Sequence, residues 1–175
     1  MDAPQRKWDY PSIVHIRLAS DSDADQLRAI YNVEVETSTA TFDLVPRTLE
    51  TQLAWQHDRQ GAYVVLVAEN LAGVVVGFAS LSSYRSRPAY STSAENSVYV
   101  ARESQGQGVG KALMLALIEA ATERGFHALF ARISGDNAAS VAVHTAVGFE
   151  IVGVERQVGR KFGRWLDVTL MQRLL

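Results

Sequence analysis

A glycine-rich segment in the middle of the chain constrains the fold more than any other feature. It reads Gln105-Gly106-Gln107-Gly108-Val109-Gly110-Lys111, follows a β-type run at 97–100, and opens an apolar helical pattern that continues to about Arg124. Glycines allow backbone N–H groups to turn toward a ligand, and a helix N-terminus carries about half a positive charge. This strand-loop-helix junction predicts a phosphate or pyrophosphate site in an α/β fold. A glycine-rich turn without a ligand has the same local pattern.

Two common phosphate-binding motifs do not fit this segment. A Walker A loop requires glycine five residues before Gly110, where the chain has Gln105, and Ser or Thr after the lysine, where it has Ala112. A dinucleotide fingerprint requires glycines two and five residues after Gly106, and the second of these positions is Lys111. ATP and NAD are therefore poor candidates for the ligand, and a nucleotide-binding, kinase-like domain is nearly excluded.

The rest of the chain alternates between strand and helix patterns. Turn residues at 70–73 predict an antiparallel hairpin between the two flanking β-rich runs. Gly125 and Gly148 are placed to end helices. Strands are expected at 15–19, 63–68, 74–79, 97–100, 128–133, 150–158 and 165–174. Helices are expected from about Ala24, at 48–59, from the glycine-rich segment to about Arg124, and at 138–147.

Length, charge and composition restrict the class of protein. The 175 residues fit one domain, which we expect at 13–175 behind an N-terminal tail at 1–12. A formal net charge of −2 without a basic run argues against nucleic acid as a partner. No apolar stretch approaches the ~20 residues that span a bilayer, and the tail lacks the apolar core of a signal peptide, so we expect no membrane and a cytoplasmic location. Cysteine is absent and the histidines are scattered at 15, 57, 127 and 144, so no metal site is predicted.

Gln105, Gly108 and Gly110 fit the pattern Gln/Arg-x-x-Gly-x-Gly/Ala, and here the chain resembles the GNAT acetyltransferases. Further segments, in the same order along residues 16–174, resemble the phosphinothricin acetyltransferase family. They are Ile30-Tyr31-Asn32, Glu36-Thr37-Ser38-Thr39, Ala89-Tyr90, Glu95-Asn96-Ser97-Val98-Tyr99-Val100, Asn137-Ala138-Ala139-Ser140, His144, Gly148-Phe149 and Gly163-Arg164-Trp165-Leu166-Asp167-Val168. The resemblance implies the GNAT fold, an α/β fold with a central mixed, mostly antiparallel sheet flanked by helices.

The resemblance also implies an acetyl-CoA site. GNAT enzymes have a bulge in the strand before the loop, which turns backbone groups toward the cofactor, and Val98, Tyr99 and Val100 occupy that strand. The pantetheine arm would pair with them, and one N–H could polarise the thioester carbonyl. The pyrophosphate would lie on the loop, whose implied contacts are Gln105, Gly106, Gln107, Gly108, Val109, Gly110 and Lys111. Asn137 matches a cofactor-contacting position, although a plain helix N-cap is also compatible, as is a solvated Lys111.

Glu95 and His144 are the catalytic candidates. An alkylammonium has a pKa of about 10, so the acceptor amine must lose a proton before it attacks. Glu95 matches the general base of the phosphinothricin acetyltransferases, and burial should raise the pKa of its carboxyl group. The residue pattern alone is equally typical of a solvent-facing strand glutamate. His144 matches a family position and could be a second base, a proton carrier or a substrate contact, or a packed helix histidine.

Four residues are expected to bind the acceptor. The loop with Arg85, Arg87 and Tyr90 precedes Glu95, and guanidinium groups pair well with carboxylate or phosphinate oxygens. In the resembled family this loop and Phe42 line the acceptor site, which favours an amino acid or an analogue such as phosphinothricin, methionine sulfoximine or methionine sulfone. Thr92 and Ser93 replace bulkier residues of the herbicide-resistance enzymes, which argues against phosphinothricin itself.

The sequence therefore favours direct acetyl transfer from acetyl-CoA to a small-molecule amine in a ternary complex. The resemblance also implies a homodimer. Acetylation of a protein N-terminus, a lysine or an amine antibiotic remains an alternative. So does a module that binds acyl-CoA as a sensor without catalysis.

Overall fold

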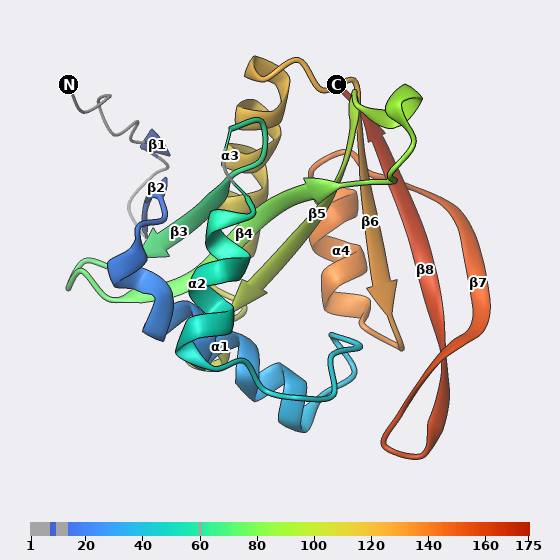
Figure 1. The fold of residues 1–175 in the computed structure, drawn as a ribbon, viewed down its shortest axis with the longest axis horizontal. Coiled ribbons are helices and arrows are strands. Elements are labelled where there is room, and N and C mark those ends of the chain that lie inside the picture. Colours follow the sequence, from blue (N-terminus) through green and yellow to red (C-terminus); the bar gives the residue numbers. More distant parts are fainter. Residues whose placement is uncertain (1–7, 10–13, 60) are drawn as a thin grey trace.

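The chain forms one mixed β-sheet with helices on both faces (Figure 1). The computed structural model describes residues 8–9, 14–59 and 61–175. In these residues the sheet has eight strands in the order β1-β2-β3-β4-β5-β6-β8-β7, and β5–β6 is its parallel pair. The strands are β1 (Trp8–Asp9), β2 (His15–Leu18), β3 (Val65–Glu69), β4 (Val75–Ser83), β5 (Ser93–Val100), β6 (Ala128–Ser134), β7 (Glu150–Lys161) and β8 (Arg164–Leu174). The helices are α1 (Ala24–Thr37), α2 (Leu49–His57), α3 (Val109–Glu123) and α4 (Ala138–Ala146), with short 3-10 turns η1 (Asp21–Asp23), η2 (Pro88–Tyr90) and η3 (Arg102–Ser104).

Each face of the sheet has its own apolar core. Successive strand residues point to opposite faces, so Leu66 and Val67 of β3 belong to different cores. Leu66 packs in the core with α3 and α4, whereas Val67 and Phe78 pack with α1 and with Trp55 of α2. These two sides are called the α3–α4 face and the α1–α2 face below.

The sheet opens between its two parallel strands. β5 and β6 pair over Ser93–Glu95 and Ala128–Phe130 and then separate, as Figure 1 shows. The β4–β5 ladder continues without a register shift to Val100. The bulge expected in this strand is therefore absent, and that expectation was wrong. The opening arises because β6 diverges from β5 after Glu95. Beyond Glu95, this edge of β5 is no longer paired with β6.

The helix ends confirm the glycine signals. Gly108 is the N-cap residue of α3 and has a φ of +87°, a left-handed conformation that favours glycine. Gly125 follows α3 at a φ of +78°, and Gly148 follows α4 at +85°. Asn137 caps α4, because its side-chain oxygen accepts a hydrogen bond from Ser140 N at 3.0 Å. Its N-cap role is thus confirmed.

Three strands extend beyond their predicted bounds by several residues, namely β4, which runs to Ser83, β5 and β7. β5 begins at Ser93 because β4 and β6 supply ladder partners to a polar segment with little β-propensity of its own. β7 continues to Lys161 through a wide bulge, in which residues 156–158 oppose Asp167 of β8. Gln157 in the bulge has a φ of +51°, and its N–H donates to Asp167 Oδ1 at 2.8 Å. The predicted strand ended at residue 158 because the bulge interrupts the strand pattern of the sequence there.

Part of the expected N-terminal tail joins the sheet. Trp8 and Asp9 form β1 and pair with Ile16 and His15 of β2. The other residues of the segment 1–12 lie outside the described residues. The domain boundary at residue 13 stays a prediction.

Candidate active site

A cavity of about 330 Å³ occupies the gap between β5 and β6. Its walls are residues 96–100 of β5, 131–134 of β6, the glycine-rich loop, and one side of α4. A second cavity of about 500 Å³ adjoins it on the α1–α2 face, next to Glu34, Ser38 and Arg102. Both cavities are lined by Val98, Tyr99 and Val100. The cleft can therefore be reached from both faces of the sheet.

The glycine-rich loop forms one end of this cavity. Gln105, Gly106, Gly108, Gly110 and Lys111 line it, and so does Asn137 at the start of α4. Gln105 ties the loop to β5, because its Nε2 donates to the Val100 carbonyl oxygen at 3.0 Å. With Gly108 as N-cap, the first N–H groups of α3 are left for a ligand at this end.

Two residues of the predicted loop site do not line the cavity. The Val109 side chain is 2% exposed and packs in the core of the α3–α4 face, so it can take part only through its backbone. Gln107 is exposed, and its Nε2 donates to the Glu103 carbonyl oxygen at 2.9 Å.

Asn96 holds the narrow end of the cleft, where β5 and β6 part. Its Nδ2 donates to the Phe130 carbonyl oxygen of β6 at 3.0 Å, one residue beyond the last β5–β6 pair. Its Oδ1 lies 2.9 Å from His144 Nε2. The Asn96 side chain thus replaces the strand ladder at the point where the strands separate.

His144 is buried on α4 between two oxygen acceptors. Its Nδ1 lies 2.8 Å from the Ser140 carbonyl oxygen, and its Nε2 faces Asn96 Oδ1. The ring is 2% exposed and packs edge-on against Phe149. Burial lowers the pKa of His144, whereas the hydrogen bond to Ser140 opposes this shift. Both ring nitrogens are engaged, so His144 reaches a ligand only by exchanging one of these partners.

Glu95 faces the α1–α2 side at the same narrow end. It is half-buried and pairs in the ladder with Phe130. Burial raises the pKa of the Glu95 carboxyl group; the Arg132 cation lowers it and the Glu155 carboxylate raises it further. A carboxyl group with a raised pKa beside a cleft is a candidate proton acceptor.

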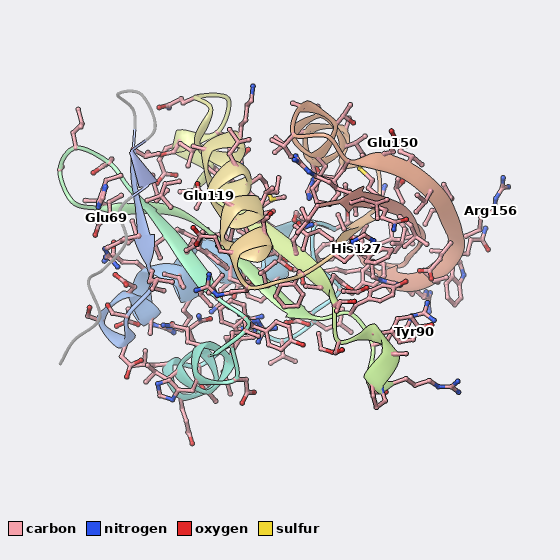
Figure 2. All side chains as sticks on the ribbon, turned by 90° about the horizontal axis from the view of Figure 1, so that it is seen from above. Glu69, Tyr90, Glu119, His127, Glu150 and Arg156 are labelled. Atoms are coloured by element: carbon pink, nitrogen blue, oxygen red, sulfur yellow. The ribbon has the colours of Figure 1, made fainter. Side chains whose placement is uncertain are left out.

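Aromatic contacts place the predicted acceptor loop beside Glu95. Tyr84 stacks on Phe130, the ladder partner of Glu95, with ring centroids 4.0 Å apart. Tyr90 meets the Tyr84 ring edge-on at 5.6 Å, and the Arg85 guanidinium lies 5.0 Å from the centre of that ring. Figure 2 shows Tyr90 on the short helical turn that projects from this end of the sheet. Arg87 is exposed at the N-cap of η2.

Phe42 lies at the other end of the α1–α2 face. Its ring rests on Gly159 of β7, where an added Cβ would lie 2.3 Å from Phe42 Cε2. Gly159 pairs with Leu166 of β8, whereas the level of Glu95 corresponds to Gln172, through Phe130. The six-residue separation between Leu166 and Gln172 along β8 corresponds to about 20 Å. The structure therefore groups Glu95 with Arg85 and Tyr90, and it keeps Phe42 apart.

Comparison with known proteins decides the family. The model of the acetyltransferase (GNAT) domain family matches residues 16–170. The chain belongs to the GNAT acetyltransferase family. The GNAT fold predicted from the sequence is confirmed, since solved GNAT structures superpose on nearly the whole chain.

Three relatives show the range of activities near this GNAT enzyme. An L-methionine sulfoximine/L-methionine sulfone acetyltransferase of Pseudomonas aeruginosa is 44% identical over 90% of this chain and 92% of its own length. A phosphinothricin acetyltransferase of Sinorhizobium meliloti, solved with acetyl-CoA, has a TM-score of 0.89, 36% identity, and coverage of 94% of this chain and 89% of its own. A ribosomal-protein-alanine N-acetyltransferase of Brucella melitensis has a TM-score of 0.88, 45% identity, and coverage of 91% and 99%.

The structure adds residues around the candidate site of this GNAT enzyme that the sequence did not reveal. Asn96 closes the cleft, Phe130 and Tyr84 anchor the acceptor loop, and Arg132 and Glu155 set the charge around Glu95. The family landmark that includes Asn96 was the available signal for that residue. Nothing in the sequence paired Arg132 with Glu155, because they meet across an intervening strand.

No group of three His, Cys, Asp or Glu side chains in 8–9, 14–59 and 61–175 is arranged to hold a metal ion. In that same part of the chain, no helix is both long and apolar enough to cross a membrane.

Proposed function

We propose that this GNAT enzyme transfers the acetyl group of acetyl-CoA to the primary amine of a small amino-acid-like acceptor, with Glu95 as general base. One observation carries the proposal. The half-buried carboxyl group of Glu95, whose pKa burial raises, directly precedes Asn96 on β5. Asn96 lines the narrow end of a cleft that is open from both faces of the sheet, although Glu95 itself lines neither cavity. One face can then admit the acetyl donor and the other the amine, so that transfer occurs directly in a ternary complex.

The residues of the cleft fit acetyl-CoA. The freed edge of β5 at Val98, Tyr99 and Val100 offers backbone groups to the amides of pantetheine, and the loop at α3 offers N–H groups to the pyrophosphate. Lys111 on the first turn of α3 adds a positive charge there. The thioester then lies toward Asn96, where a β5 N–H can stabilise the developing oxyanion. The acetyl-CoA complex of the Sinorhizobium relative supports this assignment.

The reaction needs two proton movements. Glu95 removes a proton from the ammonium group, directly or through a water molecule, and the free amine attacks the thioester carbonyl. The tetrahedral intermediate then collapses: the C–S bond breaks, the electron pair leaves on sulfur, and the second amine proton passes from nitrogen to the thiolate. His144 serves as proton carrier for this second step, because its Nε2–H can be redirected from Asn96 toward a group in the cavity.

The acceptor assignment rests on the loop beside Glu95 and on the relatives. Arg85 and Tyr90 contact Tyr84, which stacks on Phe130, the ladder partner of Glu95, and Arg87 is close to them in sequence. Relatives are named for the acetylation of methionine sulfoximine, methionine sulfone and phosphinothricin, and these acceptors are amino acids. Phe42 would contact only a longer acceptor, because it lies at the far end of the face.

We include a homodimer and a cytoplasmic location in the proposal. β7 is an edge strand of the sheet, and large apolar side chains of β7, β8 and the turn between them are more than half exposed, namely Ile151, Val152, Val154, Phe162, Trp165 and Leu174. Such a patch is typical of a protein interface. Sedimentation of the wild type should give a dimer and that of Trp165→Glu a monomer; a wild-type monomer would disprove this part.

The test of the activity is CoA release from acetyl-CoA across a panel of amines. The panel contains methionine sulfone, methionine sulfoximine, phosphinothricin, ordinary amino acids, polyamines, aminoglycosides and a peptide with an N-terminal alanine. Turnover confined to the zwitterionic acceptors supports the proposal. Turnover of the peptide alone would instead favour the activity named for the Brucella relative. No turnover with intact acetyl-CoA binding would favour a sensor.

A further inference from the structure

Arg132 and Glu155 form an ion pair on the α1–α2 face. Arg132 of β6 reaches across β8 to Glu155 of β7, with Nη1 3.2 Å from Oε1 and Nη2 2.5 Å from Oε2. The two side chains are 38% and 33% exposed, so a solute can reach the pair. Ion pairs this open to water contribute little to folding stability, and separating them is correspondingly easy.

The pair stands next to the candidate base. Glu95 is level with Phe130 in the β5–β6 ladder, and Arg132 follows Phe130 by two residues on the same face. Arg132 and Glu155 are the charged side chains that act on the Glu95 carboxyl group, with opposite signs. The Arg132 cation thus lies near two carboxylates, those of Glu95 and Glu155. Arg132 also lines the cavity between β5 and β6, which places it at the passage between the two faces.

We propose that this ion pair opens to receive the head group of an α-amino acid, with Arg132 binding its carboxylate and Glu155 and Glu95 holding its ammonium group. The inference rests on the proposed function and names the residues that would select its substrate. A zwitterion carries both charges on one carbon atom. It can therefore exchange the Arg132–Glu155 pair for two new pairs without a change in net charge. A guanidinium fork suits a carboxylate, and the exchange delivers the ammonium to the base.

The test crosses two acceptors with three variants of the full-length enzyme. L-methionine sulfone carries the carboxylate, and 3-(methylsulfonyl)propylamine is the same molecule without it. Arg132→Gln should lower kcat/KM for the amino acid about 10- to 100-fold, the range of a lost charged hydrogen bond, and leave the plain amine within about threefold. Arg156→Gln is the matched control, since Arg156 adjoins Glu155 and points away from the molecule (Figure 2).

The pH profile gives a second readout, which tests whether the ion pair acts on the candidate base. The acid limb of kcat/KM reports the pKa of the base in the free enzyme. Arg132→Gln removes a cation that lowers this pKa, so the limb should move to higher pH. Glu155→Gln removes a carboxylate that raises it, so the limb should move to lower pH. Thermal melting confirms that each variant is folded.

The outcomes separate this inference from the proposed function. Equal losses for both acceptors in Arg132→Gln, or limbs that stay in place, would overturn the charge exchange while the acetyltransferase activity stands. If the wild type acetylates neither acceptor, the proposed function fails, and calorimetry with CoA-loaded protein decides the inference. Binding of the amino acid that is lost in Arg132→Gln supports it, and absence of wild-type binding overturns it.

Discussion

At the scale of single residues, the cleft depends on one buried amide. Asn96 is 5% exposed and connects the Phe130 carbonyl to His144. Asn96→Leu keeps the size of the side chain but leaves two buried polar groups unpaired, which should lower the free energy of unfolding by about 2–4 kcal/mol. In a His144→Phe background one of those groups is gone, so the same change should cost less. Denaturant unfolding of the wild type, the two single variants and the double variant measures this coupling. An equal loss of unfolding free energy from Asn96→Leu in both backgrounds would contradict it.

A second residue-scale prediction concerns the contact between Gly159 and Phe42. Gly159→Ala places a Cβ 2.3 Å from Phe42 Cε2, so the ring must move, and we expect a loss of about 1–2 kcal/mol in stability. In Phe42→Ala the clash disappears, and Gly159→Ala should then be close to neutral. Gly153→Ala on the same strand is the matched control, because no atom lies within 4 Å of its added Cβ. Equal effects of Gly159→Ala with and without Phe42 would show that the ring does not rest on the glycine.

At the scale of elements, the start of α3 joins the fold to the cofactor. Gly108→Asp puts a side chain and a negative charge at a φ of +87°, where the pyrophosphate is proposed to lie. Acetyl-CoA affinity, measured by calorimetry, should fall at least about tenfold. Gly73→Asp is the matched control, since Gly73 has a φ of +75° in the β3–β4 turn and open space around it. It should show a similar loss of stability and unchanged affinity. Equal acetyl-CoA affinities of the two variants would show that the pyrophosphate does not bind at this loop.

The same elements show how far the sequence leads. Apolar periodicity and punctuating glycines located all four α-helices, because those signals are local. β5 was underpredicted because its residues 93–96 become a strand through their neighbours β4 and β6. A bulge was expected to turn the backbone groups of this strand outward, whereas the β4–β5 ladder is regular and the divergence of β6 exposes the β5 edge. Arg132 and Glu155 could not be paired from the sequence, since their contact depends on the registers of three strands.

At the scale of the whole molecule, the sheet separates the two substrates. The cavity of the α3–α4 side and the cavity of the α1–α2 side meet at β5, where successive residues point to alternate faces. In the proposed reaction, Asn96 and His144 therefore stand on the donor side, and Glu95 stands on the acceptor side. A direct transfer needs this arrangement, because the amine and its base must approach the thioester from the face opposite the bound cofactor.

The most direct measurement is the pH dependence of kcat/KM for Glu95→Gln, together with its affinity for acetyl-CoA. The wild type should lose activity below an apparent pKa that lies above the usual value for glutamate, since burial raises the pKa of Glu95. Glu95→Gln should retain acetyl-CoA affinity, lose about 10²–10⁴-fold in kcat, and regain activity only as pH rises toward the pKa of the free amine. An unchanged kcat with the same acid limb would show that another group accepts the proton.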